Sequence, residues 1–180
     1  MLADDNDSGH GLYRASLFKG YRQMILAFSK GKGLTGALIR WFTWSKYAHV
    51  AAVLPEGVIE AMPFKGVVKH DFWSDTSHLD FFIVTGPYEN RRAAAYLNSN
   101  IGRQYDWFGI LRFIPRWRKS NDRVFCSELI FSAMRFAGIE LLRGIPPEKV
   151  SPGLLACSPY LHPISVSSVF SQYPKLNNEE

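Results

Sequence analysis

Two apolar segments joined by a Pro-Glu-Gly turn constrain the fold of this chain more than any other feature of its sequence. Residues 47–54 and 58–61 have the length and composition of buried β-strands, and the turn at 55–57 predicts that they form a hairpin. Each strand carries one ionisable side chain in apolar surroundings, His49 in the first and Glu60 in the second. Because burying either group without a partner costs free energy, we expect the two side chains to pair.

The length of the hairpin loop decides whether His49 and Glu60 can meet. Side chains alternate between the two faces of a sheet, so these residues share a face only if the loop holds an even number of residues. A four-residue loop over 53–56 places them directly opposite each other. A three-residue loop over 55–57 sends them to opposite faces unless a β-bulge intervenes. The alternatives are a core histidine that has another partner and a glutamate that lies on an edge strand.

A second feature is a cysteine at the start of a predicted helix. After Cys126, apolar residues recur with a helical period until Gly138 ends the pattern. A helix N-terminus carries about half a unit of positive charge, which lowers a thiol pKa from about 8.5 toward neutrality. Its backbone N–H groups can also stabilise an oxyanion. The alternative is that Cys126 is a small apolar residue that packs the end of the helix.

The composition is that of one globular domain. The chain has 180 residues, of which 47% are hydrophobic and 14% aromatic, enough to build a single core. The pattern of strands and helices predicts an α+β fold, with an antiparallel sheet or small barrel packed against helices. We expect residues 1–20 to be flexible, 21–170 to form the domain and 171–180 to fray.

Hydrophobic periodicity predicts the remaining elements. Further strands extend the hairpin into an antiparallel meander, and short helices follow or precede them. The predicted strands lie at 23–28, 66–70 and 79–84, and the predicted helices at 34–42, 87–97 and 105–113.

The net charge bears on possible partners. A formal charge of +5 allows attraction to acidic surfaces such as phospholipid headgroups or cell-wall polymers. Basic residues concentrate at 112–123 around Trp117, a segment that could contact an anionic substrate or membrane, or be a solvated loop. Because no nucleic-acid-binding motif is present, we expect no nucleic-acid partner. The sequence does not determine the oligomeric state.

The cysteines and the N-terminal residues bear on the compartment. Cys126 and Cys157 form neither a disulfide framework nor a zinc-binding spacing, so we expect free thiols in a reducing compartment. The acidic residues 1–7 lack the pattern of a signal peptide, and no apolar run reaches the length of a membrane span. A cytoplasmic location is therefore the default expectation, although export that needs no signal peptide would leave no trace in the sequence.

The residues singled out above form a set with defined chemistry. A thiol at a helix N-terminus, a histidine and a carboxylate are the nucleophile, base and orienting group of a cysteine hydrolase. Cys126 would attack an acyl carbon, His49 would move the proton, and Glu60 would hold the imidazole in the right tautomer. A metal site made of His49, Glu60 and His70 is the alternative, but the sequence identifies no further ligand. We therefore expect no metal and no cofactor.

Four short runs, taken in order, resemble a known family. Residues 47–50, 58–61, 102–106 and 125–129 resemble the circularly permuted NlpC-type branch of papain-like cysteine hydrolases, and most closely its YiiX-like group, which is related to lecithin retinol acyltransferase. In the permuted branch the histidine strand precedes the cysteine helix, as in this chain. The family's opening Gly-Asp-Ile-Leu strand is replaced here by residues 23–26, and the basic segment has no counterpart.

The resemblance implies a permuted papain-like fold with a defined set of site residues. It assigns Cys126 as the nucleophile, His49 as the base and Glu60 as the third polar residue. It also implies that Tyr105, Tyr47 and Ser127 contact the substrate.

The function expected from the residues and the resemblance together is hydrolysis of amide bonds, cell-wall peptides included, or of ester bonds through an acyl-enzyme. A lipid acyltransferase or thioesterase of the same fold and a non-catalytic peptide- or glycan-binding module are the alternatives. The expected substrates are thus peptides, cell-wall peptides or acyl lipids, with peripheral contact to an anionic membrane.

Overall fold

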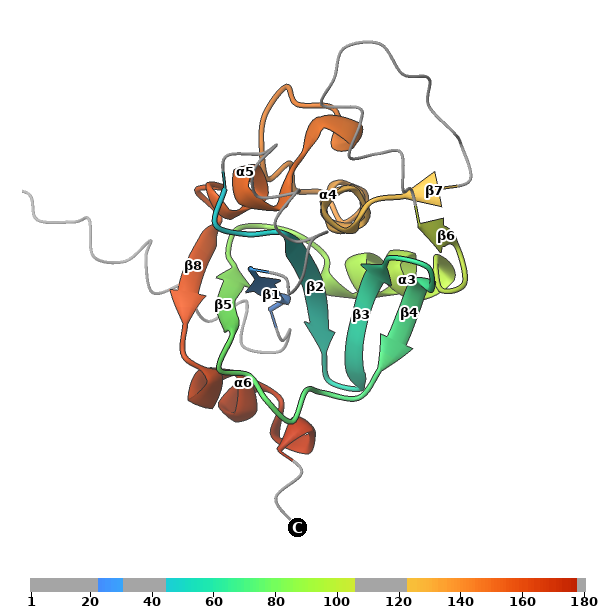
Figure 1. Ribbon diagram of the computed structural model, residues 1–180. Helices are drawn as coiled ribbons and strands as arrows, with labels where there is room; N and C mark the ends of the chain where they lie inside the picture. The colour runs from blue at the N-terminus through green and yellow to red at the C-terminus, as the bar shows by residue number, and fades with distance from the viewer. Residues whose placement is uncertain (1–22, 31–44, 106–122, 178–180) are drawn as a thin grey trace, which may run out of the picture.

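A six-stranded antiparallel sheet is the centre of the fold (Figure 1). The structure is a computed structural model that describes residues 23–30, 45–105 and 123–177. The strand order is β4-β3-β2-β1-β5-β8, so the sheet has two ends and is open rather than closed into a barrel. This confirms the predicted α+β class. The strands are β1 (Ile25–Ser29), β2 (His49–Leu54), β3 (Gly57–Met62), β4 (Gly66–His70), β5 (Leu79–Val84) and β8 (Leu161–Ile164).

The helices of the described ranges surround this sheet. The helix predicted after Cys126 is confirmed, and it is followed by Gly138, whose φ of +98° suits a residue without a side chain. The helical elements are α3 (Asn90–Ser99), α4 (Cys126–Phe136), η2 (Pro147–Lys149), α5 (Pro152–Ala156), α6 (Val166–Gln172) and η3 (Pro174–Leu176). None of the helices in the described part of the chain has the length and apolar character needed to cross a bilayer.

Two predicted helices have other outcomes. The helix predicted at 34–42 lies outside the described residues. The helix predicted from Tyr105 is wrong at its first residue, because Tyr105 belongs to the short strand β6 (Gln104–Tyr105). This strand pairs in parallel with β7 (Arg123–Val124), so that Tyr105 lies opposite Val124. Residues 106–113 lie outside the described ranges.

Apolar layers cover both faces of the sheet at β1. Leu26 and Phe28 belong to the cluster that includes the buried face of α4, whereas Ile25 and Ala27 belong to a cluster on the other face. The alternation follows from the period of two in a β-strand. Since both faces of β1 are covered, its sequence is an uninterrupted apolar run rather than an alternating one.

The C-terminal residues are packed, which corrects the prediction that 171–180 fray. The Tyr173 and Leu176 side chains are buried in the second cluster, and the Tyr173 hydroxyl donates to the Gln23 carbonyl at 2.7 Å. The polar composition of this segment concealed two apolar side chains that cover the sheet face opposite α4. The ordered domain therefore extends through residue 177, and residues 178–180 lie outside the described ranges.

Tyr173→Ala is expected to lower the free energy of unfolding by about 3–5 kcal/mol, because it empties a fully buried site and removes a hydrogen bond. Urea denaturation measures this change. The exposed Lys175, two residues away, is the control, and Lys175→Ala should change stability by less than about 0.5 kcal/mol. Equal, small effects of the two substitutions would show that the segment does not stabilise the fold.

Candidate active site

The register of the β2–β3 hairpin places His49 and Glu60 on one face of the sheet. Ala52 pairs with Ile59 and Leu54 with Gly57, so the loop holds two residues, 55 and 56. Both loop lengths considered from the sequence, four residues over 53–56 and three residues over 55–57, are therefore wrong, although the requirement for an even number holds. The turn closes early because Gly57 has a φ of +123°, a conformation that side-chain-bearing residues rarely adopt.

His49 and Glu60 are in direct contact, as the sequence predicts. Continuing the register places Glu60 level with Ala51, so His49 is its diagonal neighbour on the same face. The His49 Nε2 atom hydrogen-bonds the Glu60 Oε2 atom. The Glu60 side chain is only 6% exposed and that of His49 is 21% exposed. The pairing thus gives a buried carboxylate one of the partners that it needs.

A second imidazole occupies the other oxygen of Glu60. His70 Nε2 lies 2.6 Å from Glu60 Oε1, and His70 Nδ1 lies 2.7 Å from the Asp71 carbonyl oxygen. His70 pairs with Val58 across the β3–β4 ladder, which places it on the same face as Glu60. From the sequence, His70 is a candidate only for a metal ligand. The same alternation argument, applied to the next hairpin, would have identified it as a partner of Glu60.

Cys126 is the first residue of α4 and interacts with His49. The helix packs against β2 and β3 and is seen almost end-on beside the start of β2 in Figure 1. Burial lowers the pKa of His49, but the Cys126 thiol and then the Glu60 carboxylate outweigh it and raise this pKa to about 10. The Cys126 side chain has no exposed surface. The structure therefore brings together the thiol, imidazole and carboxylate singled out from the sequence.

The charge state of Glu60 follows from its surroundings. Burial raises the pKa of this carboxyl, but hydrogen bonds and charge attraction from His49 and then His70 outweigh burial and lower the pKa below its ordinary value. Glu60 is therefore an ionised acceptor at neutral pH, held between two imidazoles. Such a group can fix the orientation of His49 and stabilise its protonated form.

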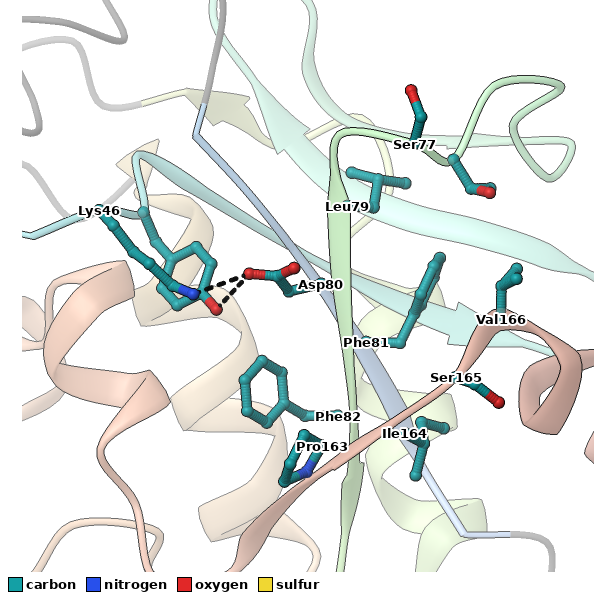
Figure 2. A pocket seen from close by; sticks show the side chains of 12 residues that line it. Lys46, Ser77, Leu79, Asp80, Phe81, Phe82, Pro163, Ile164, Ser165 and Val166 are labelled. Carbon is teal, nitrogen blue, oxygen red and sulfur yellow. Dashed lines mark hydrogen bonds and ion pairs between the residues drawn. The ribbon is translucent and has the colours of Figure 1, made fainter.

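A groove of about 470 Å³ opens beside Tyr47 (Figure 2). Its polar end is a network in which the Tyr47 hydroxyl donates to Asp80 Oδ2 at 2.6 Å and Lys46 Nζ lies 3.0 Å from the same oxygen. Apolar side chains of β5, β8 and the start of α6 form most of the remaining wall, and Thr76, Ser77 and Ser165 complete it. The apolar residues are Leu79, Phe81, Phe82, Pro163, Ile164 and Val166. The hydroxyl of Tyr47 and then the Lys46 ammonium lower the pKa of the Asp80 carboxyl, which stays ionised.

The groove lies at the end of the sheet that carries His49. Ser29 of β1 pairs with His49 on one side and with Leu79 on the other. Two strand spacings, or about 10 Å, therefore separate the His49 and Leu79 backbones. Tyr47 is 5% exposed and packs on Phe28 with ring centroids 5.1 Å apart. Its hydroxyl thus reaches the groove while its ring belongs to the core.

Ser127 and Tyr105 are the other two residues expected to contact the substrate. Ser127 is fully buried and its hydroxyl donates to the Val150 carbonyl at 2.5 Å, so this side chain anchors α4. The expectation that the Ser127 side chain contacts substrate is therefore corrected. The Tyr105 backbone lies opposite Val124, two residues before Cys126, and its side chain lies outside the described part of the structure.

Comparisons with known proteins identify a shared fold. No protein-family model and no curated protein matches the chain. Among solved structures, the chain is similar to the metalloprotein YiiX from Escherichia coli O157:H7, a DUF1105 protein, with a TM-score of 0.59 and 17% sequence identity. The similarity covers 80% of this chain and 96% of the YiiX chain. It supports the resemblance to the YiiX-like group at the level of the fold.

The raised pKa of His49 predicts a pH-dependent stability. The contribution of protonated His49 to the free energy of unfolding should be fully present below about pH 6.5 and be lost as the pH rises to about 10. The stability difference between the native chain and His49→Ala, measured by urea denaturation, should therefore narrow over this range. Val50, the buried apolar neighbour of His49 on β2, is the control, since Val50→Ala removes no titrating group and should give a difference that does not change with pH. A constant difference for His49→Ala would contradict the raised pKa.

Proposed function

We propose that the chain is a cysteine-dependent hydrolase of amide or ester bonds with a permuted papain-like fold. The observation that supports this most directly is that one imidazole, His49, interacts with both the Cys126 thiol and the buried Glu60 carboxylate. Glu60 occupies Nε2 of this ring, so Nδ1 is the nitrogen left to exchange a proton with the thiol. The permuted assignment rests on the order of His49 before Cys126, and the fold shared with YiiX supports the likeness to the YiiX-like group.

The proposed reaction has two halves. The raised pKa of His49 means that this imidazole already holds the proton given up by Sγ of Cys126 at neutral pH. Sγ then attacks the acyl carbon, and the resulting oxyanion accepts hydrogen bonds from N–H groups at the start of α4. The His49 imidazolium then donates its proton to the leaving nitrogen or oxygen, which leaves a thioester on Cys126. In the second half, His49 takes a proton from water, and the hydroxide attacks the thioester carbon. The C–S bond then breaks, which releases the acid and leaves Sγ as a thiolate beside the protonated His49. Glu60 stabilises the imidazolium in both halves.

The metalloprotein YiiX, whose fold this chain shares, raises the question of a metal in this chain. Within the described ranges, no group of three or more histidine, cysteine or acidic side chains is arranged to hold an ion. His49 and His70 each direct Nε2 at a different oxygen of Glu60, so the two nitrogens do not converge on a common point. These donors do not fit a metal site, and no step of the proposed mechanism uses one.

The groove favours a second candidate function, in which the substrate is an ester or thioester of a lipid chain. The protein would then hydrolyse this bond or transfer the acyl chain. Most of the groove's wall is apolar and comes from β5, β8 and α6 (Figure 2), and its polar end includes Tyr47, which precedes His49 by two residues in the chain. An extended hydrocarbon chain would bury apolar surface against this wall. A peptide substrate would gain less from such a wall, so the preferred length of the acyl chain distinguishes the candidates.

The reactivity of Cys126 tests the proposed hydrolase. In a Cys157→Ser background, the rate of Cys126 alkylation by iodoacetamide is measured from about pH 4 to about pH 10. A reactive plateau that extends well below pH 8 and disappears in His49→Ala is expected, because an adjacent imidazolium favours the thiolate. A single titration near the ordinary thiol pKa of about 8.5, indifferent to His49, would favour a binding module.

The lipid candidate is tested with short-chain and long-chain p-nitrophenyl esters. If the groove binds acyl chains, kcat/KM should rise with chain length, and Phe82→Ala should reduce the preference for long chains by about tenfold. Phe136 of α4, which is 48% exposed and does not line the groove, provides the control substitution Phe136→Ala. Activity independent of chain length in the native chain would argue against a lipid substrate.

A further inference from the structure

We infer that His70 is a positioning residue of the candidate site, which holds Glu60 so that Oε2 faces His49. The inference rests on the proposed function, since positioning matters only if His49 serves Cys126. It starts from the two oxygens of one carboxylate. Each oxygen of Glu60 has an imidazole partner, His49 at Oε2 and His70 at Oε1. A carboxylate held at one oxygen can rotate about its last bond, whereas one held at both cannot.

The hydrogen bonds of His70 define its role as a donor. Its Nδ1 atom faces the Asp71 carbonyl oxygen, which can only accept, so Nδ1 carries a proton. Its Nε2 atom faces Glu60, which is ionised and also only accepts. Nε2 of His70 therefore donates to Oε1 of Glu60 in this arrangement. The result is a carboxylate that has one imidazole at each of its two oxygens.

Other contacts fix the His70 ring in place. It makes an edge-to-face contact with Trp73, with ring centroids 5.7 Å apart. The carbonyl that accepts from Nδ1 belongs to the adjoining residue, Asp71, so the chain itself determines the ring orientation. The Glu60 side chain is 6% exposed and that of His70 is 33% exposed. His70 thus links the buried carboxylate to the surface.

Because Cys126 is buried, the direction in which a substitution changes its alkylation rate distinguishes a positioning role from a structural one. Because the thiol has no exposed surface, a reagent reaches it through local opening of the structure. A substitution that merely loosens the fold increases opening and speeds alkylation. A substitution that misplaces Glu60 weakens the support of His49 and slows alkylation. A positioning role and a structural role of His70 therefore shift the rate in opposite directions.

The experiment is a double-substitution cycle, read as the alkylation rate of Cys126 near neutral pH in the Cys157→Ser background. His70→Ala should slow the reaction about tenfold, the size expected when a supporting partner of a site residue is lost. His70→Gln should restore most of the rate, because its amide can donate in place of Nε2. In a Glu60→Gln background, His70→Ala should change the rate by less than about twofold. The control is His78→Ala, whose side chain is similarly exposed at 37% and pairs with Asp75 instead.

Three results would overturn the inference. The first is an unchanged or faster reaction in His70→Ala, and the second is an equal slowing by His70→Ala with and without the Glu60 carboxylate. The third is a native rate that is indifferent to His49→Ala, which would reject the proposed function together with the role of His70. An effect of His49→Ala without any effect of His70→Ala would leave the hydrolase standing and reject only the positioning role.

Discussion

A single buried carboxylate determines how the candidate site is built. Glu60 lies on a strand whose other side chains are apolar, and an ionised group at this depth is tolerated only when both oxygens have partners. The fold supplies one partner from each neighbouring strand, His49 from β2 and His70 from β4. The central position of β3 between these strands therefore fixes the geometry of the imidazole that meets Cys126.

The backbone features that build the site are local and few. A two-residue turn at Gly57 sets the register that places His49 and Glu60 on one face. A Cβ at residue 57 would lie 2.5 Å from the His70 carbonyl oxygen, so the same glycine permits the close approach of β4. The start of α4 then brings the thiol to the histidine. Three consecutive strands and one helix end thus account for every group in the proposed mechanism.

Alternation and charge burial made much of this site accessible from the sequence. The pairing of His49 with Glu60 follows from two ionisable residues in an apolar hairpin, and the helix after Cys126 follows from its period. The loop length did not follow, because it depends on the φ of one glycine. The expected substrate contact of Ser127 was wrong because the carbonyl that accepts from its hydroxyl belongs to Val150, which lies 23 residues further along the chain. The groove depends on β5 meeting β8, a contact between distant segments that local patterns do not reveal.

The parallel pairing of β6 with β7 joins two parts of the chain that are distant in sequence. Tyr105 and Val124 lie side by side although residues 106–122 separate them in the sequence. The second of these strands ends two residues before Cys126, the first residue of α4. Backbone pairing with β6 therefore anchors the entry to the helix that carries the thiol.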